Sequence, residues 1–264
     1  MGLTIVTRPH PLVWQLTLSQ PPDNRLTPAA LHEMLGRFDQ IEADWRRTNA
    51  GKPPVEWQGG ALIITGGGPK FFSNGLDPET TKNPDFTNGL FEPFKNRLLT
   101  FPLITVAAIN GHCFAGGFMT ALCCDIRIMT GGRGLLSLNE NVIGIPLAPA
   151  GVELCKMKLS ANYLTPVALG DRFNQKQALA AGIIHEIVDV SRGPNGLLER
   201  AVEIGVSEGP KASWGVWGVI KQGMYRTVID ACALPRGPRS LEVDELFWAR
   251  MAREDQAAAV KSKL

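Results

Sequence analysis

The sequence has 264 residues, of which 44% are hydrophobic and 20% charged, a composition typical of a globular protein and not of a disordered chain. Lys and Arg number 27 and Asp and Glu 25, so the net charge of +2 gives no electrostatic reason to expect a nucleic acid partner. The five cysteines form no Cys-x-x-Cys pair and the four histidines are scattered, so neither a disulfide framework nor a metal site is expected.

In chain order, the hydrophobic pattern predicts strands alternating with helices, which is the α/β class. A strand is predicted over 12–18, and Thr27 followed by Pro28 predicts the capped start of a helix. The apolar face of that helix comprises Leu31, Met34, Leu35, Phe38, Ile41 and Trp45. Further strands are predicted over 61–64, 104–108, 125–129 and 183–188, and further helices over 91–99, 116–124 and 150–168.

The composition changes near residue 209, where two helical patterns rich in tryptophan begin. The first contains Trp214 and Trp217, and the second starts at Ser240 and contains Trp248. These large side chains require burial, either on the core or against another subunit. We therefore divide the chain into a core, 1–205, and a C-terminal helical region, 206–264, which we expect to serve oligomerisation.

The last three residues are Ser262, Lys263 and Leu264, the tripeptide that the peroxisomal import receptor recognises. The first residues do not resemble a secretory signal, and no apolar run has the length of a membrane-spanning helix. The sequence therefore predicts a peroxisomal location, with the import receptor as a partner and no membrane span.

Two glycine-containing turns, 70–77 and 110–117, each follow a predicted strand. Glycine allows a close approach of the backbone to a ligand, and two amides aimed at one point form an oxyanion hole. Spacing alone favours the simpler explanation that both turns only connect a strand to a helix. Neither turn matches a dinucleotide fingerprint or a phosphate-binding loop, which disfavours a nucleotide-binding protein.

Six segments follow one another between residues 5 and 190: Asn24-Arg25-Leu26, FFSNGLD, PLITVAAINGHCFAGG, ALCCDIRI, LSLNENVIGI and VALGDRFNQKQALAAGIIHEIVD. In this order they resemble the enoyl-CoA hydratase/isomerase (crotonase) superfamily and, within it, the plant-type peroxisomal Δ3,Δ2-enoyl-CoA isomerases. The resemblance implies a spiral core of ββα units with a C-terminal helical extension, assembled as a homotrimer or hexamer. It also implies an acyl-CoA substrate and no cofactor, since CoA is part of the substrate.

The resemblance assigns roles to residues of these segments. The backbone N–H groups of Leu76 and Gly116 are the implied oxyanion-hole donors, and Glu140 is the implied base, allowing one inserted residue in 131–134. The implied substrate-binding residues are Ser73, Asn74, Gly75, Asp77, Ala115, Gly117, Met119 and Lys221. Met119 stands where hydratases of the family carry a first glutamate. Hydration most naturally uses two such groups, whereas one carboxylate suffices to move a double bond.

Several of these residues also have simpler explanations. Glu140 is the only acid between Asp125 and Glu153, and without the resemblance it would be taken for a capping residue in a loop. Asp77 is expected to cap the first turn. Other residues are expected to be structural or solvated: His112, Cys123, Cys124, Glu153, Lys221 and Arg226.

The sequence thus predicts an acyl-CoA isomerase that shifts a 3-enoyl-CoA double bond to the 2-trans position, in fatty-acid β-oxidation. Two alternatives from the same superfamily stay open. One is a hydratase-like enzyme of a specialised peroxisomal pathway, which the missing second glutamate disfavours. The other is a non-catalytic acyl-CoA-binding homologue, which the presence of Glu140 together with both glycine turns disfavours.

Overall fold

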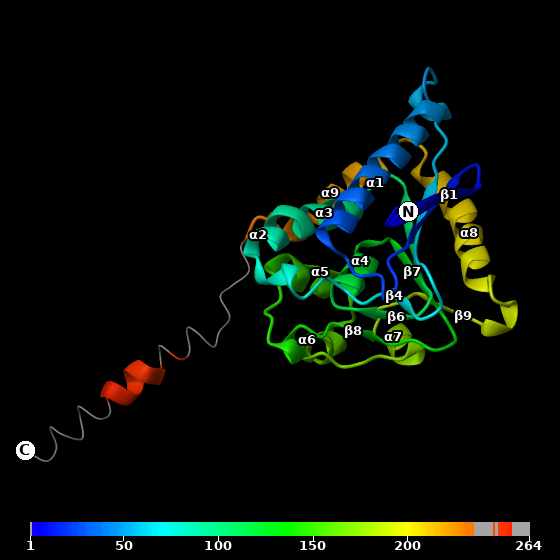
Figure 1. Ribbon diagram of the computed structural model, residues 1–264. Helices are drawn as coiled ribbons and strands as arrows, with labels where there is room; N and C mark the ends of the chain where they lie inside the picture. The colour runs from blue at the N-terminus through cyan, green and yellow to red at the C-terminus, as the bar shows by residue number, and fades with distance from the viewer. Residues whose placement is uncertain (1, 235–244, 246–247, 255–264) are drawn as a thin grey trace, which may run out of the picture.

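The computed structural model describes residues 2–234, 245 and 248–254 (Figure 1). The strands are β1 Thr4–His10, β2 Val13–Leu18, β3 Ala61–Gly66, β4 Phe71–Ser73, β5 Ile104–Ile109, β6 His112–Phe114, β7 Ile126–Thr130, β8 Leu136–Ser137 and β9 Glu186–Val188. The α-helices are α1 Pro28–Thr48, α2 Pro84–Phe86, α3 Glu92–Leu99, α4 Gly116–Cys123, α5 Pro149–Lys158, α6 Leu164–Leu169, α7 Gln175–Ala180, α8 Gly196–Glu208, α9 Trp217–Met224 and α10 Arg226–Ala231.

The strands form two sheets. The larger has the order β1-β2-β3-β5-β7-β9, with β1 antiparallel to β2 and all other neighbours parallel. The smaller consists of β4, β6 and β8, all parallel. Three times the chain contributes one strand to the larger sheet, one to the smaller and then a helix, as β3-β4-α3, β5-β6-α4 and β7-β8-α5. This repeat confirms the predicted α/β class with ββα units.

The larger sheet is covered on both faces, which explains its nearly continuous apolar strands. In β3, Ala61 and Ile63 belong to the cluster that packs against α8, whereas Leu62 and Ile64 belong to the main core with α1, α3 and α4. Figure 1 shows α8 on one side of this sheet and α1 and α3 on the other. The sheet therefore separates a thin layer from the thick layer that contains the smaller sheet.

The first predicted helix is confirmed as α1. The Thr27 hydroxyl accepts a hydrogen bond from the Ala30 amide at 3.3 Å, and Pro28 occupies the first helical position. The predicted apolar face is buried except for Leu35, which is half-buried. Predicted strands also occur at β2, β3, β5 and β7.

Several element predictions are incomplete or wrong. The helix predicted over 150–168 is two helices, α5 and α6, because the chain becomes extended at Leu159 and a 3-10 turn at Ala161–Tyr163 precedes α6. The strand predicted over 183–188 is only β9, and a π-helical turn, Thr87–Phe91, precedes α3. Strands β1, β4, β6 and β8 and helices α7 and α8 were not predicted.

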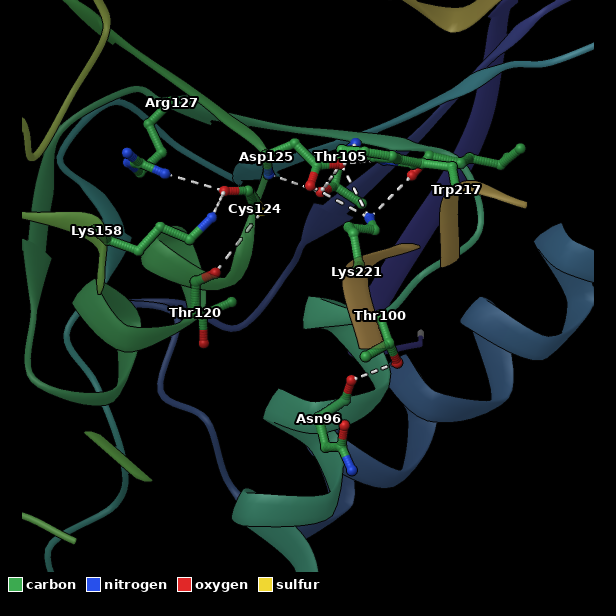
Figure 2. Close-up of polar contacts among 11 residues, drawn as sticks. Asn96, Thr100, Thr105, Thr120, Cys124, Asp125, Arg127, Lys158, Trp217 and Lys221 are labelled. Atoms are coloured by element: carbon green, nitrogen blue, oxygen red, sulfur yellow. Dashed lines mark hydrogen bonds and ion pairs between the residues drawn. The ribbon is translucent and has the colours of Figure 1, made fainter. Parts of the chain in front are cut away.

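A buried ion pair fastens the C-terminal helix α9 to the core (Figure 2). The Lys221 ammonium lies 3.0 Å from an Asp125 carboxylate oxygen, with side-chain exposures of 0% and 9%. The same carboxylate accepts hydrogen bonds from the Thr105 amide and hydroxyl, at 2.9 and 3.0 Å, and from the Trp217 indole at 3.2 Å. Burial lowers the pKa of Lys221, whereas Asp125 acts in the opposite direction. The expectation of a solvated helix face for Lys221 is therefore wrong, and Lys221, predicted to bind substrate, does not line the cavity described below.

The rest of the C-terminal region is described in part. Trp217 is half-buried, whereas Trp214 and Trp248 are exposed, at 55% and 66%. Residue Ser240, which was expected to start a helix, and the tripeptide 262–264 lie outside the described residues. Among the helices that the structure describes, none has the length and apolar character required to cross a membrane.

Lys158 at the end of α5 gives a testable pH dependence. Its ammonium lies 4.6 Å from the Tyr225 ring centroid and, like the Arg127 guanidinium, points at the Cys124 carbonyl (Figure 2). Burial, reinforced by Arg127, lowers the pKa of Lys158 from 10.5 to about 8. Between these two values the unfolded chain binds more protons than the folded one, so the contribution of this lysine to stability rises with pH.

We therefore expect the free energy of unfolding of the wild type, relative to Lys158→Met, to increase from pH 8 to pH 10.5. Urea denaturation across this interval measures the difference. Lys156→Met is the matched control, since Lys156 lies on the same helix but is 55% exposed and pairs with Glu153. A difference that stays constant with pH would show that Lys158 titrates normally.

Candidate active site

The three segments that the sequence singled out meet at one edge of the smaller sheet. Strand β6 pairs with β4 through Cys113 and Ser73 and with β8 through Phe114 and Ser137. All three strands are parallel, so the residues that follow them emerge side by side at the carboxyl edge, where ligands of α/β proteins typically bind. These residues are 74–76 after β4, 115–116 after β6 and 139–140 after β8.

A cavity of about 190 Å³ lies at this edge. All three residues expected to be catalytic, Leu76, Gly116 and Glu140, line it, together with Asn74 and Ala115. It is also lined by residues for which no role was predicted, namely Arg25, Pro78, Thr81, Asn139, Ile143 and Ile145. Arg25 was noted only as part of a family-like segment, and its position in the cavity was not anticipated.

The direction of the Leu76 amide is set by the peptide group that it shares with Gly75. The Gly75 carbonyl accepts a hydrogen bond from the Leu26 amide at 2.9 Å. In a trans peptide the N–H points opposite to the carbonyl, so the Leu76 N–H points away from Leu26. Gly75 has a φ of +84°, a conformation that favours glycine, and its own amide donates to the Ser73 hydroxyl at 3.1 Å.

The Gly116 amide is the first of helix α4. The preceding residue, Ala115, has a φ of +47°, which is unusual for a residue with a side chain. It is held there by hydrogen bonds from its amide to the Ser137 carbonyl, at 2.9 Å, and to its carbonyl from the Met119 amide, at 3.0 Å. The Gly116 N–H therefore points out of the helix start. Within the described part of the chain, neither the Leu76 nor the Gly116 amide donates a hydrogen bond.

The two amides lie near each other. A Cβ built on Gly116 would lie 3.2 Å from the Leu76 nitrogen, and a Cβ built on Gly75 would lie 3.0 Å from the Gly116 nitrogen. Each glycine thus keeps the amide of the other turn uncovered. Two neighbouring backbone donors that bond to no acceptor among the described residues are the kind of arrangement that an oxyanion hole requires.

Glu140 is carried into the cavity wall by a short turn after β8. Its carbonyl accepts hydrogen bonds from the Ile143 and Ile145 amides, at 3.1 and 2.9 Å, and Gly144, with a φ of +67°, reverses the chain. The Glu140 side chain is partly buried and shares the wall with the apolar side chains of Ile143 and Ile145. The turn thus fixes the backbone from which a carboxylate reaches the cavity.

The other predicted substrate-binding residues do not line the cavity. Ser73, Gly75 and Gly117 are not among its lining residues, and β4 and α4 pack closely here, since a Cβ on Gly117 would come within 2.7 Å of the Ser73 carbonyl oxygen. Asp77 was expected to cap the first glycine-containing turn, but its carboxylate accepts a hydrogen bond from the Glu79 amide at 3.3 Å and so caps the turn that follows. Met119 is 3% exposed in the core and packs near Gly151 of α5.

His112, Cys123 and Cys124, which were expected to be structural, lie in surroundings that favour this role. The His112 ring accepts a hydrogen bond from the Leu135 amide at 3.2 Å, and burial lowers its pKa. Cys123 and Cys124 are buried, and burial raises the pKa of Cys123 to about 12, which keeps this thiol protonated. Among the described residues, no group of His, Cys, Asp and Glu side chains is arranged to hold a metal ion.

Comparison with known proteins places this geometry in context. The sequence model of the enoyl-CoA hydratase/isomerase family matches residues 10–206. Enoyl-CoA delta isomerase 3 of Arabidopsis thaliana is 28% identical over 221 residues, covering 80% of this chain and 87% of the relative. Peroxisomal enoyl-CoA delta isomerase 2 of the same plant is 26% identical over 223 residues, with the same coverage. A carnitinyl-CoA dehydratase of Salmonella typhi is 36% identical, but over only 54% of each chain.

Solved structures show the same fold. An enoyl-CoA isomerase of Mycobacterium tuberculosis, solved in its apo form, superposes with a TM-score of 0.73 and 24% identity, covering 88% of this chain and 94% of that chain. At this identity the likeness supports the spiral arrangement of ββα units and nothing about chemistry.

Proposed function

Because the chain belongs to the enoyl-CoA hydratase/isomerase family, we propose that it shifts the double bond of a 3-enoyl-CoA to the 2-trans position. One observation carries this proposal. Among the described residues that line the cavity, Glu140 is the only carboxylate, and Met119, at the position of a hydratase glutamate, is buried in the core. A single carboxylate can move a proton from one carbon to another, whereas water addition most naturally uses two groups.

In the proposed reaction, the Leu76 and Gly116 amides donate hydrogen bonds to the thioester oxygen of the substrate. Glu140 removes a proton from C2, and the electrons of the C2–H bond delocalise into a dienolate whose negative charge lies on that oxygen. The protonated Glu140 then returns the proton to C4, leaving the double bond between C2 and C3. Each amide donor contributes about 2.7–4 kcal/mol of transition-state stabilisation in comparable sites.

The experiment supplies the purified protein with 3-enoyl-CoA and, separately, with 2-enoyl-CoA. We expect rapid formation of the conjugated thioester from the first substrate and little 3-hydroxyacyl-CoA from the second. Dominant hydration of the second substrate would identify a hydratase instead. Tight binding of both thioesters without turnover would identify a non-catalytic acyl-CoA-binding protein.

The substitution Gly116→Ala tests the two-amide arrangement. The added methyl carbon would lie 2.8 Å from the Leu76 Cγ and 3.2 Å from the Leu76 nitrogen. It would therefore displace the Leu76 residue and cover its amide donor. We expect kcat for isomerisation to fall by about 10²–10³-fold, the cost of losing one oxyanion donor. Gly36→Ala on α1 is the control, because a Cβ there meets no atom within 4 Å. Full activity in Gly116→Ala would contradict the proposed two-amide arrangement.

We further propose a peroxisomal location, supported by the relative named as peroxisomal. A homotrimeric or hexameric assembly through the region 206–264 is also proposed. It is supported by apolar side chains that the described part of this region exposes, namely Trp214, Val216, Val219, Ile220 and Met224.

A further inference from the structure

Arg25 lines the cavity and contacts the first glycine-containing turn, 70–77. One of its terminal nitrogens, Nη1, donates to the Asn74 carbonyl at 2.9 Å and to the Leu76 carbonyl at 3.1 Å. These two carbonyls flank Gly75. The next residue, Leu26, donates its amide to the Gly75 carbonyl at 2.9 Å. Residues 25 and 26 therefore hold three consecutive carbonyls of the turn.

Asp23 holds both Arg25 and Asn74 in place through hydrogen bonds. Its carboxylate accepts a hydrogen bond from the Arg25 Nε at 3.0 Å and from the Asn74 side-chain amide at 2.7 Å. Its backbone carbonyl also accepts the Asn74 amide at 2.9 Å. The Asp23 and Arg25 side chains are 17% and 33% exposed, so the ion pair is partly shielded from water. A guanidinium fixed by a carboxylate can present its remaining donors in a defined direction.

The turn needs such support because glycine tolerates more than one backbone conformation. Rotation of the peptide group between Gly75 and Leu76 would turn the Leu76 N–H out of the cavity and place a carbonyl oxygen there. That oxygen would repel the negative charge that develops on a thioester. The three hydrogen bonds from Arg25 and Leu26 oppose this rotation, since they hold the carbonyls on both sides of the peptide as well as its own.

We propose that Arg25 is a positioning residue that keeps the Leu76 amide directed at the substrate oxygen, and this inference rests on the proposed function. Arg25 acts through the backbone and not by binding the CoA phosphates. Its loss affects the transition state, in which charge develops on the oxygen, more than the ground state.

The test compares Arg25→Met and Arg25→Lys with the wild type, with Arg47→Met on α1 as control, since Arg47 is 72% exposed. We expect kcat to fall by about 10²-fold in Arg25→Met, the effect of a small misplacement of a catalytic group, with KM little changed. Lysine keeps the charge but cannot present the planar fork, so Arg25→Lys should recover only part of the activity.

A second readout isolates the oxygen contact. The ultraviolet absorbance of a bound conjugated enoyl-CoA shifts to longer wavelength when its carbonyl is polarised, and we expect Arg25→Met to lose this shift. The affinity for an S-alkyl-CoA thioether, which lacks the oxygen, should stay unchanged. A higher KM with unchanged kcat, together with weaker thioether binding, would show that Arg25 binds CoA and would overturn the proposal. An unchanged kcat and absorbance shift would overturn it as well.

The experiments distinguish a failure of the proposed isomerisation from a failure of the proposed role of Arg25. If the wild type polarises the bound thioester but forms no isomerised product, the proposed reaction is wrong while the role of Arg25 is still measured by the absorbance shift. If isomerisation is present and Arg25→Met retains both activity and shift, the reaction stands and the positioning role is wrong.

Discussion

Glu140→Gln is expected to reduce kcat for the isomerisation of 3-enoyl-CoA by about 10⁴-fold, the upper end of what a general acid–base group contributes. The same side chain is proposed both to remove the C2 proton and to deliver it to C4, so its loss disables both steps. Glutamine preserves size and polarity, and the affinity for a saturated acyl-CoA should therefore stay close to that of the wild type. Steady-state kinetics together with a binding titration separate the two effects.

Glu153→Gln is the matched control for this experiment. Glu153 lies on α5, pairs with Lys156 at 2.8 Å and does not line the cavity. We expect it to retain full activity. Unchanged turnover in Glu140→Gln would show that another group transfers the proton and would end the assignment of Glu140.

Among the substitutions proposed for this protein, Lys221→Met should produce the largest decrease in the free energy of unfolding. It leaves the Asp125 carboxylate buried without its counter-charge, and the hydrogen bonds that remain to it from the described residues come from Thr105 and Trp217. Breaking a buried pair in this way typically costs about 3–5 kcal/mol of the free energy of unfolding. Urea denaturation followed by circular dichroism measures the loss.

Two further variants define the cause of that loss. Adding Asp125→Asn to Lys221→Met should restore part of the stability, because a neutral amide needs no counter-charge. Lys211→Met removes a 67% exposed lysine that pairs with Glu208 in the same region, and should change stability little. If Lys221→Met and Lys211→Met lowered the free energy of unfolding equally, the buried ion pair would contribute no more to stability than the exposed one.

Patterns local in sequence predicted their elements well. Thr27 and Pro28 define the start of α1 because a cap needs only residues within one turn, and Thr27 indeed bonds to Ala30. The glycine turns likewise pointed to the segments that line the cavity. The strands that carry them, β4, β6 and β8, were missed because runs of two or three residues show no periodicity.

Contacts distant in sequence could not be predicted in the same way. Arg25 bonds to carbonyls 49 and 51 positions away, and nothing in its neighbourhood indicates that direction. Lys221 looked like a solvated residue because its partner, Asp125, lies 96 positions earlier in the chain. Only the assembled fold reveals that one of these cations faces a cavity and the other is internal.

The smaller sheet has a consequence for how such sequences diverge. Glu140 is placed by the pairing of β8 with β6, through Phe114 and Ser137, and not by its distance along the chain from the glycine turns. The link between β7 and β8, residues 131–135, begins with three exposed residues, so an added or lost residue there changes the length of a loop and leaves the carboxylate where it is. Alignments that keep strand register, and allow gaps in this link, will therefore locate the equivalent of Glu140 in distant homologues more reliably than fixed residue spacing.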